Sequence, residues 1–311
     1  MSESTSTRQR IVPNIWCNRN AEEVGAFYAD AFENSSSEVE ARYPTEGLLD
    51  FQRDFAGEPL TVSVTISGYR LMLINAGDEF EPNPSISFML NFDPLLFDGD
   101  GELARASLDR LWERLSDGGA VLMPLGEYPF SERYGWVRDR YGVSWQLMLT
   151  DPAGDPRPFI IPALLFGERV QNHAGEAVGH YLDVFSEFEG GAELGAYVLY
   201  PEQQGPAEPG AVMFSDFRLG EQWFVAMDSG VEQAFTFSCG VSLEVSCDGQ
   251  DEIDRLWAGL SAVPEAEQCG WLADRFGVSW QIVPSNMEEL MQRPGAYEKM
   301  MGMKKLVIAD F

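Results

Sequence analysis

Long apolar runs are missing from this 311-residue sequence, and basic residues are few. No stretch approaches the roughly 20 consecutive apolar residues that a membrane-spanning helix needs. Residues 1–10 are polar and lack the apolar core of a secretory signal, so they are expected to form a disordered tail. With 45% hydrophobic and 23% charged residues, the composition is that of a soluble globular protein. A cytoplasmic location is expected.

Positive charge is scarce. Acidic residues outnumber basic ones by 50 to 21, which gives a formal net charge of −29. The lysines are confined to the C-terminal end of the chain, at Lys299, Lys304 and Lys305. A field of this sign repels the phosphates of nucleic acids and of anionic membranes. Neither nucleic acid nor membrane is therefore expected as a partner.

Cysteine and histidine are also scarce. The four cysteines form no C-x-x-C pair and match no zinc-binding spacing, which favours reduced thiols. Their positions are Cys17, Cys239, Cys247 and Cys269. The two histidines, His173 and His180, fall at or near the start of one predicted helix. His180 is interpreted as a residue of the helix face rather than a ligand.

What the sequence does contain is an internal repeat. The twelve residues GWVRDRYGVSWQ at 135–146 recur as GWLADRFGVSWQ at 270–281. Two shorter blocks upstream recur in the same order, 28–32 at 181–185 and 109–112 at 254–257. Three ordered matches indicate a tandem duplication and therefore two similar α+β domains. The predicted parts are a tail over 1–10, domains over 11–152 and 159–285, a proline-rich linker over 153–158, and a C-terminal extension over 286–311.

Apolar periodicity predicts the elements of the first copy. Asn20 is the expected N-cap of the first helix. The predicted order is β-α-β-β-β, repeated once within the copy, so that the chain contains four such modules. The expected ranges are strand 11–17, helix 21–32 and strands 38–43, 60–66 and 69–74, then strand 86–92, helix 103–116 and strands 120–123, 135–139 and 143–149.

Alternation within these strands separates two faces. Strand 86–92 places Ser87, Met89 and Asn91 opposite its apolar face, and strand 143–149 does the same with Gln146 and Met148. A sheet face of small, neutral polar and methionine side chains suits a ligand cleft. A solvent-exposed or dimer-packed face remains the alternative.

One carboxylate falls on the corresponding face of the second copy. Strand residues Ser242, Glu244 and Ser246 alternate with apolar neighbours. Inside a concavity, burial would raise the pKa of Glu244 and suit it to general acid–base catalysis. A solvated glutamate on an edge strand is the alternative.

The repeated motif and the stretches 250–254, 268–269 and 300–309 resemble the vicinal oxygen chelate superfamily of glyoxalases and bleomycin-resistance proteins. The resemblance is specifically to its PhnB-like branch, often labelled demethylubiquinone methyltransferase-like. It implies an α+β fold of two tandem glyoxalase-like domains, each of paired βαβββ modules forming a curved mixed sheet around a cleft. Single-copy relatives pair as homodimers, so this chain is expected to be a monomeric pseudo-dimer or a homodimer.

The resemblance also implies positions for metal ligands. They fall near Pro13 and Pro162, and at Met72, Ser87, Gln146, Phe224, Ser242 and Gln281. Such residues do not make a site for a catalytic divalent metal, so no metal and no other cofactor is expected. A nucleotide-binding methyltransferase would show a glycine-rich turn after a strand, whereas Gly118 and Gly119 follow a helix.

Three functions stay open. The first is a metal-free protein that binds a small, partly apolar molecule. The second is a glyoxalase-like lyase, isomerase or dioxygenase that uses an unrecognised metal or a carboxylate such as Glu244. The third is an interaction protein whose clefts are filled by side chains. The predicted ligand-binding residues are Trp16, Met72, Ser87, Met89, Asn91, Trp136, Gln146 and Met148 in the first domain and Phe224, Ser242, Trp271 and Gln281 in the second.

Overall fold

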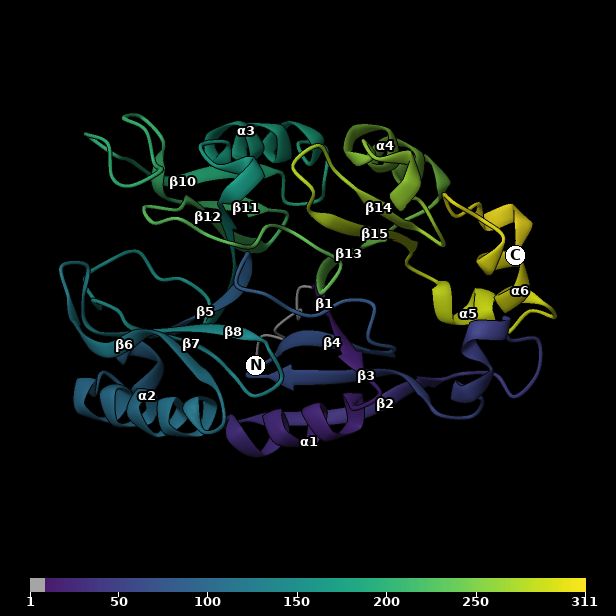
Figure 1. The fold of residues 1–311 in the computed structure, drawn as a ribbon, viewed down its shortest axis with the longest axis horizontal. Helices are drawn as coiled ribbons and strands as arrows, with labels where there is room; N and C mark the ends of the chain where they lie inside the picture. Colours follow the sequence, from purple (N-terminus) through teal and green to yellow (C-terminus); the bar gives the residue numbers. More distant parts are fainter. Residues whose placement is uncertain (1–8) are drawn as a thin grey trace, which may run out of the picture.

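Two mixed β-sheets lie between two pairs of helices in the computed structural model, which describes residues 9–311. Helices α1 (Ala21–Ala31) and α2 (Gly101–Ser116) run along one side of the molecule. Helices α3 (Ala174–Val184) and α4 (Gln250–Leu260) run along the other (Figure 1). The α+β class expected from the sequence is confirmed.

The first half of the chain folds as two βαβββ modules, as predicted. Strand boundaries differ from the expected ones by a few residues, most at the hairpin that contains β6 and β7. The first module contains β1 (Ile11–Asn18), β2 (Ser35–Arg42), β3 (Pro59–Ile66) and β4 (Tyr69–Ala76). The second contains β5 (Ile86–Phe92), β6 (Ala120–Tyr128), β7 (Ser131–Arg138) and β8 (Ser144–Leu149).

The second half departs from the expected pattern in its last module, which has one strand fewer. The stretch between α4 and the following strand is too short for a counterpart of β6 and contains a 3₁₀ turn at Pro264–Ala266. The third module contains β9 (Ile160–Phe166), β10 (Ala192–Leu199), β11 (Val212–Leu219) and β12 (Gln222–Asp228). The fourth contains β13 (Val241–Cys247), β14 (Trp271–Ala273) and β15 (Ser279–Pro284).

Each sheet combines one module from each half of the chain. Sheet A has the strand order β14-β15-β13-β1-β4-β3-β2, and sheet B has the order β10-β11-β12-β9-β5-β8-β7-β6. The halves meet where β1 pairs antiparallel with β13 and where β5 pairs antiparallel with β9. The resemblance implied that both modules of one sheet belong to the same copy, and the observed strand order differs in this detail.

Short connections account for this exchange of modules, in which each copy contributes one module to each sheet. The segment between β8 and β9 crosses only β5, a distance of about 10 Å at the usual strand spacing. Its Phe159 carbonyl accepts a hydrogen bond from the backbone N–H of Asn91 in β5. The two segments that change sheets, 77–85 and 229–240, pass against each other. A Cβ at Gly240 would lie 2.0 Å from the Glu81 carbonyl oxygen, so only glycine allows this approach.

The repeated motif builds the core between the helices and the sheets. Asp139 accepts hydrogen bonds from the Tyr28 hydroxyl at 2.7 Å, from Trp145 Nε1 at 2.9 Å and from the backbone N–H groups of Tyr141 and Val143. It therefore ties α1 to β8 and to the motif's turn. The second copy repeats the arrangement with Asp274, Tyr181, Trp280, Phe276 and Val278.

Capping of the helices differs from the prediction. Asn20 precedes α1, but its side chain makes no cap hydrogen bond. The first N–H group of the helix, that of Ala21, instead donates to Oδ1 of Asn75 at the end of β4. Asp228 at the end of β12 accepts from Ala174 of α3 in the same way. The cap thus comes from a strand that is distant in sequence.

The chain ends are tied to sheet A. Residues 1–8 of the predicted tail lie outside the described residues, whereas Gln9 bonds to the backbone of Arg70. At the other end, α5 (Met287–Met291) and α6 (Ala296–Met301) pack together beside the 3₁₀ segment Asp50–Phe55 (Figure 1). No helix within residues 9–311 combines the length and apolar character that crossing a membrane requires.

Candidate functional site

The exchange of modules regroups the predicted site residues. Those of the first domain do not share one sheet: Trp16 and Met72 lie on sheet A together with residues of the second copy. Sheet A carries Trp16, Met72, Ser242, Glu244, Trp271 and Gln281 on the face away from the helices. Sheet B carries Ser87, Met89, Asn91, Trp136, Gln146 and Met148 on the same kind of face. These are called the inner faces below.

Phe224 lies on the opposite face of its sheet, so the expectation for this residue was wrong. Its ring stacks on Phe217 with centroids 5.7 Å apart, within the core beneath α3. The hairpins β3–β4 and β11–β12 superpose with Asn75 on Asp228, which makes Val225 the counterpart of Met72. The sequence alignment was one residue out of register, and a one-residue shift reverses the face.

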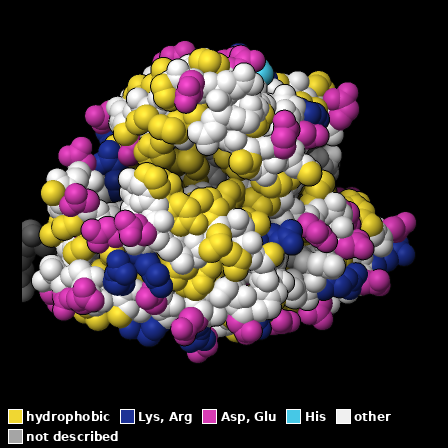
Figure 2. All heavy atoms as spheres, turned by 60° about the vertical axis from the view of Figure 1, so that its left-hand side comes forward, with side chains coloured by type: hydrophobic (Ala, Val, Ile, Leu, Met, Phe, Trp, Pro, Cys, Tyr) yellow, Lys and Arg dark blue, Asp and Glu magenta, His cyan; other side chains and the backbone are white. Residues whose placement is uncertain are grey.

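The inner face of sheet B is apolar. Met89, Ile161, Ala163 and Val225 form a buried cluster over β5, β9 and β12. Partly buried side chains pack against it from the neighbouring strands, namely Met148, Phe214, Trp223 and Met227. The end of the molecule that carries β6 and β10 in Figure 1 is turned forward in Figure 2, where hydrophobic side chains gather in a hollow. We call this depression the sheet B hollow.

A polar row crosses the same face. Tyr134 donates its hydroxyl to Oε1 of Gln146 at 2.7 Å, and Nε2 of Gln146 donates to Oγ of Ser87 at 2.8 Å. Burial raises the pKa of Tyr134, so its hydroxyl stays protonated and remains a donor. Trp136 donates to Ser144 beside the row. Ser87, Trp136 and Gln146 were predicted from the sequence as ligand-binding residues. Tyr134 was not, although the alternation in β7 places it on the same face.

The linker contributes to sheet B. Arg157 forms an ion pair with Asp216 of β11 at 2.7 Å, and its guanidinium lies 3.9 Å from the ring centroid of Trp223. Asp216 also accepts from the backbone N–H of Ala196 in β10. One buried carboxylate therefore holds the linker and the edge strand at this sheet, which the linker's composition did not reveal.

The inner face of sheet A is more polar. Gln281 donates to Oγ of Ser242 at 2.9 Å, repeating the pair found in sheet B. Glu244 is partly buried beside it, with the Asn14 amide 3.4 Å away as a donor. Burial raises the pKa of the Glu244 carboxyl, and Arg70 offsets part of that effect. A raised pKa of this kind suits a carboxyl to proton transfer.

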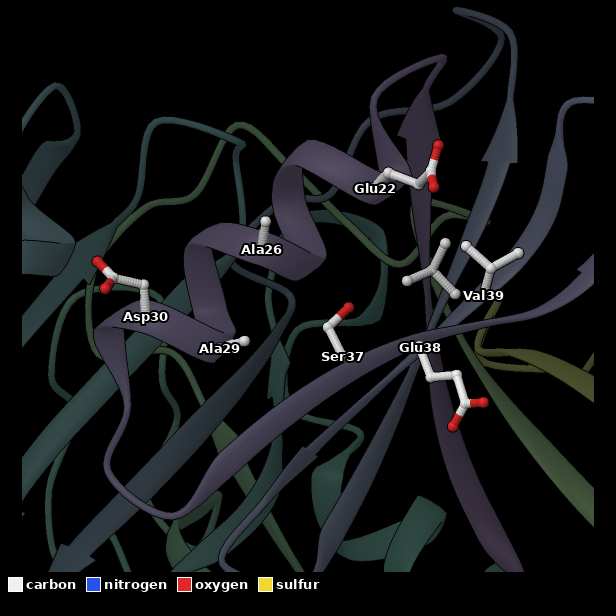
Figure 3. A pocket seen from close by; sticks show the side chains of 8 residues that line it. Glu22, Ala26, Ala29, Asp30, Ser37, Glu38 and Val39 are labelled. Carbon is white, nitrogen blue, oxygen red and sulfur yellow. The ribbon is translucent and has the colours of Figure 1, made fainter.

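Two further depressions lie outside the sheet B hollow. A groove of about 490 Å³ runs between α1 and β2, with small side chains such as Ala26 and Ala29 along it. Its carboxylates Glu22, Asp30 and Glu38 occupy separate corners in Figure 3, so they do not converge on one point. A second depression of about 420 Å³ lies beside the motif's turn and is lined in part by Trp16.

The metal positions implied by the fold do not fit a catalytic cation. Asn14, Met72, Ser242 and Gln281 meet on sheet A and offer two amides, a thioether and a hydroxyl. Divalent metals in catalytic sites take several imidazole or carboxylate ligands. No group of three His, Cys, Asp or Glu side chains placed to hold a metal occurs within residues 9–311. His180 lies on α3 against Phe276, 6.1 Å between ring centroids.

A family model described as 3-demethylubiquinone-9 3-methyltransferase matches residues 9–148 and again residues 158–283. The chain belongs to this family. The two matched segments confirm the tandem repeat expected from the motif, and the family is the one that the PhnB-like resemblance indicated. No curated protein matches.

Several solved structures resemble this chain. Glyoxalase I from Zea mays is 10% identical with a TM-score of 0.51, and the match covers 90% of this chain and 95% of that one. A PhnB protein from Bacillus cereus is 30% identical with a TM-score of 0.38, and its whole length matches 46% of this chain. A protein from Pseudomonas aeruginosa is 24% identical over 46% of this chain and 98% of its own, with a TM-score of 0.36.

The family's name raises the question of a methyl donor. Gly118 and Gly119 lie between the end of α2 and β6, and Gly119 lets the backbone approach the Arg138 carbonyl closely. This turn follows a helix, whereas nucleotide-binding folds place theirs after a parallel strand. These glycines therefore fit a packing role and do not fit a nucleotide cofactor.

Proposed function

We propose that this protein binds a small, partly apolar molecule in the sheet B hollow without using a metal ion. The observation that carries the proposal is the inner face of sheet B, where partly buried side chains pack over a buried apolar cluster, namely Met148, Phe214, Trp223 and Met227. The buried polar row of Tyr134, Gln146 and Ser87 lies on the same face. Apolar pockets with a few fixed polar groups are typical of small-molecule sites.

The lining also indicates the kind of ligand. Methionine side chains are flexible and polarisable, so they adapt to flat or irregular apolar ligands. The Gln146 amide and the Ser87 hydroxyl are neutral and offer both donor and acceptor capacity. A compact aromatic or dicarbonyl compound, which presents an apolar body and one or two carbonyl acceptors, matches this surface.

A thermal-shift screen of small aromatic and dicarbonyl compounds tests the proposal. A ligand present at about a hundred times its Kd should raise Tm by about 5 °C or more. Met148→Gln, which places an amide in the hollow, should abolish the shift. Met72→Gln on the inner face of sheet A is the matched control and should keep it. A shift that both variants lose equally, or that neither loses, would contradict binding in the hollow.

A second candidate function rests on a different observation. Glu244 is a partly buried carboxylate with a raised pKa on the inner face of sheet A, which favours a glyoxalase-like lyase, isomerase or dioxygenase. Turnover of a dicarbonyl compound that Glu244→Gln abolishes would support the enzyme. Elemental analysis of the purified protein adds a separate measurement, because a stoichiometric divalent metal would favour the enzyme over the metal-free binding protein.

A further inference from the structure

Two tryptophans meet across the inner face of sheet A. Trp16 lies on β1 and Trp271 on β14, with β13 and β15 between them in the sheet. Three strand spacings amount to about 14 Å along the sheet. The two ring centroids are nevertheless 6.3 Å apart and the rings are nearly perpendicular. The two side chains therefore meet on this face although their strands are not neighbours in the sheet.

Glu244 belongs to these intervening strands. It stands on β13 in register with Gln281 of β15 and with Val12 of β1, and Gln281 is in turn opposite Trp271. The Gln281 amide is already bonded to Ser242. The carboxylate thus lies on the same face as the two indole rings, and the Gln281 amide donates to Ser242 rather than to this carboxylate.

The charge of Glu244 has no ion-pair partner. Among the ion pairs of residues 9–311 none includes this carboxylate, and its hydrogen-bond donor is the neutral Asn14 amide at 3.4 Å. Arg70 is the cation that lowers the pKa of this carboxyl, and its guanidinium is paired with Glu40. A buried carboxylate without a cation is costly unless something else supplies one.

Sheet B provides an internal comparison. In register, Met89 occupies the position of Glu244 and Leu165 that of Trp16. Trp136 is the counterpart of Trp271, and its Nε1 donates to Ser144. A sheet with the same strand arrangement therefore forms with methionine and leucine at these two positions. Folding of such a sheet does not require a carboxylate or a second indole there.

We propose that this part of sheet A binds a small organic cation, a quaternary or protonated amine with an apolar body. The indole rings of Trp16 and Trp271, together with the Phe80 ring that packs against Trp16 at 5.1 Å, supply an aromatic surface for cation–π contacts, and Glu244 supplies the opposite charge. The net charge of −29 raises the local concentration of cations around the protein. This site is distinct from the sheet B hollow and does not depend on the function proposed for it.

Calorimetric titration with choline tests the proposal, because its uncharged carbon analogue 3,3-dimethylbutan-1-ol has nearly the same shape. Choline should bind about tenfold or more tightly than the alcohol, the factor that corresponds to one cation–π or ion-pair contribution. Glu244→Met, which introduces the residue of sheet B, should remove this preference. Trp271→Leu should weaken choline binding about fivefold or more, and Trp136→Leu on sheet B should leave it unchanged.

Several results would overturn the proposal. Equal affinity for choline and the alcohol, or no heat of binding up to about 10 mM choline, would exclude a cation site of useful strength. Choline binding that survives Glu244→Met and Glu244→Gln with unchanged affinity would remove the carboxylate from the site. An equal loss in Trp136→Leu would place the effect elsewhere. Circular dichroism confirms that each variant is folded before titration.

Discussion

Asp139 and Asp274 occupy the same position in the two copies of the motif, and each accepts four hydrogen bonds within the core. All four partners are donors, so a carboxylate satisfies them where a neutral side chain would not. Burial raises the pKa of both carboxyls, and the hydrogen bonds offset part of that rise. The motif is therefore explained by folding rather than by catalysis.

Asp139→Asn should lower the free energy of unfolding by about 3 kcal/mol, because the amide NH₂ would face a donor in a buried site. Urea denaturation measures this, and Asp274→Asn should give a similar loss. Asp117→Asn is the control, since Asp117 pairs with Arg140 at the surface and the loss should stay below about 0.5 kcal/mol. Equal effects at Asp139 and Asp117 would contradict the role assigned to the motif.

Glu244 predicts that the stability of the protein depends on pH. Its raised pKa means that ionisation costs the folded state more than the unfolded state, so the wild type loses stability as pH rises above the ordinary glutamate pKa, about 4.3. The advantage of Glu244→Gln over wild type should therefore grow between about pH 4 and about pH 7.5. Urea denaturation at both pH values measures it. A constant difference, or one matched by Glu46→Gln at an exposed position, would be inconsistent with a buried charge.

At the scale of elements, local sequence signals were sufficient for most of the first half. Strand 86–92 was predicted with its observed bounds, and alternation placed Ser87, Met89 and Gln146 on one inner face. The repeat shows that the second copy is shorter before residue 270, but the strand number of the fourth module and the face of Phe224 were not predicted. Both depend on the length of the chain between elements. A deletion changes the number of strands, and a one-residue offset moves a side chain to the other face, while the apolar pattern of the sequence looks the same.

The N-terminal cap of α1 also could not be predicted from the local sequence, and it gives a testable prediction. Asn20 has the sequence signature of an N-cap, but the acceptor for the first N–H group is Asn75, a residue of β4. Asn75→Ala should cost about 1–2 kcal/mol of unfolding free energy, whereas Asn20→Ala should cost less than about 0.5 kcal/mol. Thermal or urea denaturation compares the two variants. A larger loss for Asn20→Ala would restore the prediction made from the sequence.

For the whole molecule, the exchange of modules decides what holds the two copies together. Both sheets cross from one half to the other through the strand pairs β1–β13 and β5–β9, so neither sheet is complete within one copy. Side chains add to this contact: Gln222 of β12 bonds to the backbone of Ile11, and Arg10 pairs with Glu252. Each inner face thus combines strands of both copies, and the different linings of the two faces show that each half supplies different residues to each face.

Cutting the linker should therefore leave the halves joined. We would insert a recognition sequence for a site-specific protease between the exposed residues Gly154 and Asp155 and place an affinity tag on the N-terminal half. After cleavage, the tag should retain the C-terminal half, and the complex should elute at the size of the intact 34.7 kDa chain. Its unfolding midpoint should now rise with protein concentration, because the loop that joined the halves no longer supplies their effective concentration. Release of the untagged half without denaturant would mean that each copy completes its own sheet, contrary to the strand order that forms both inner faces.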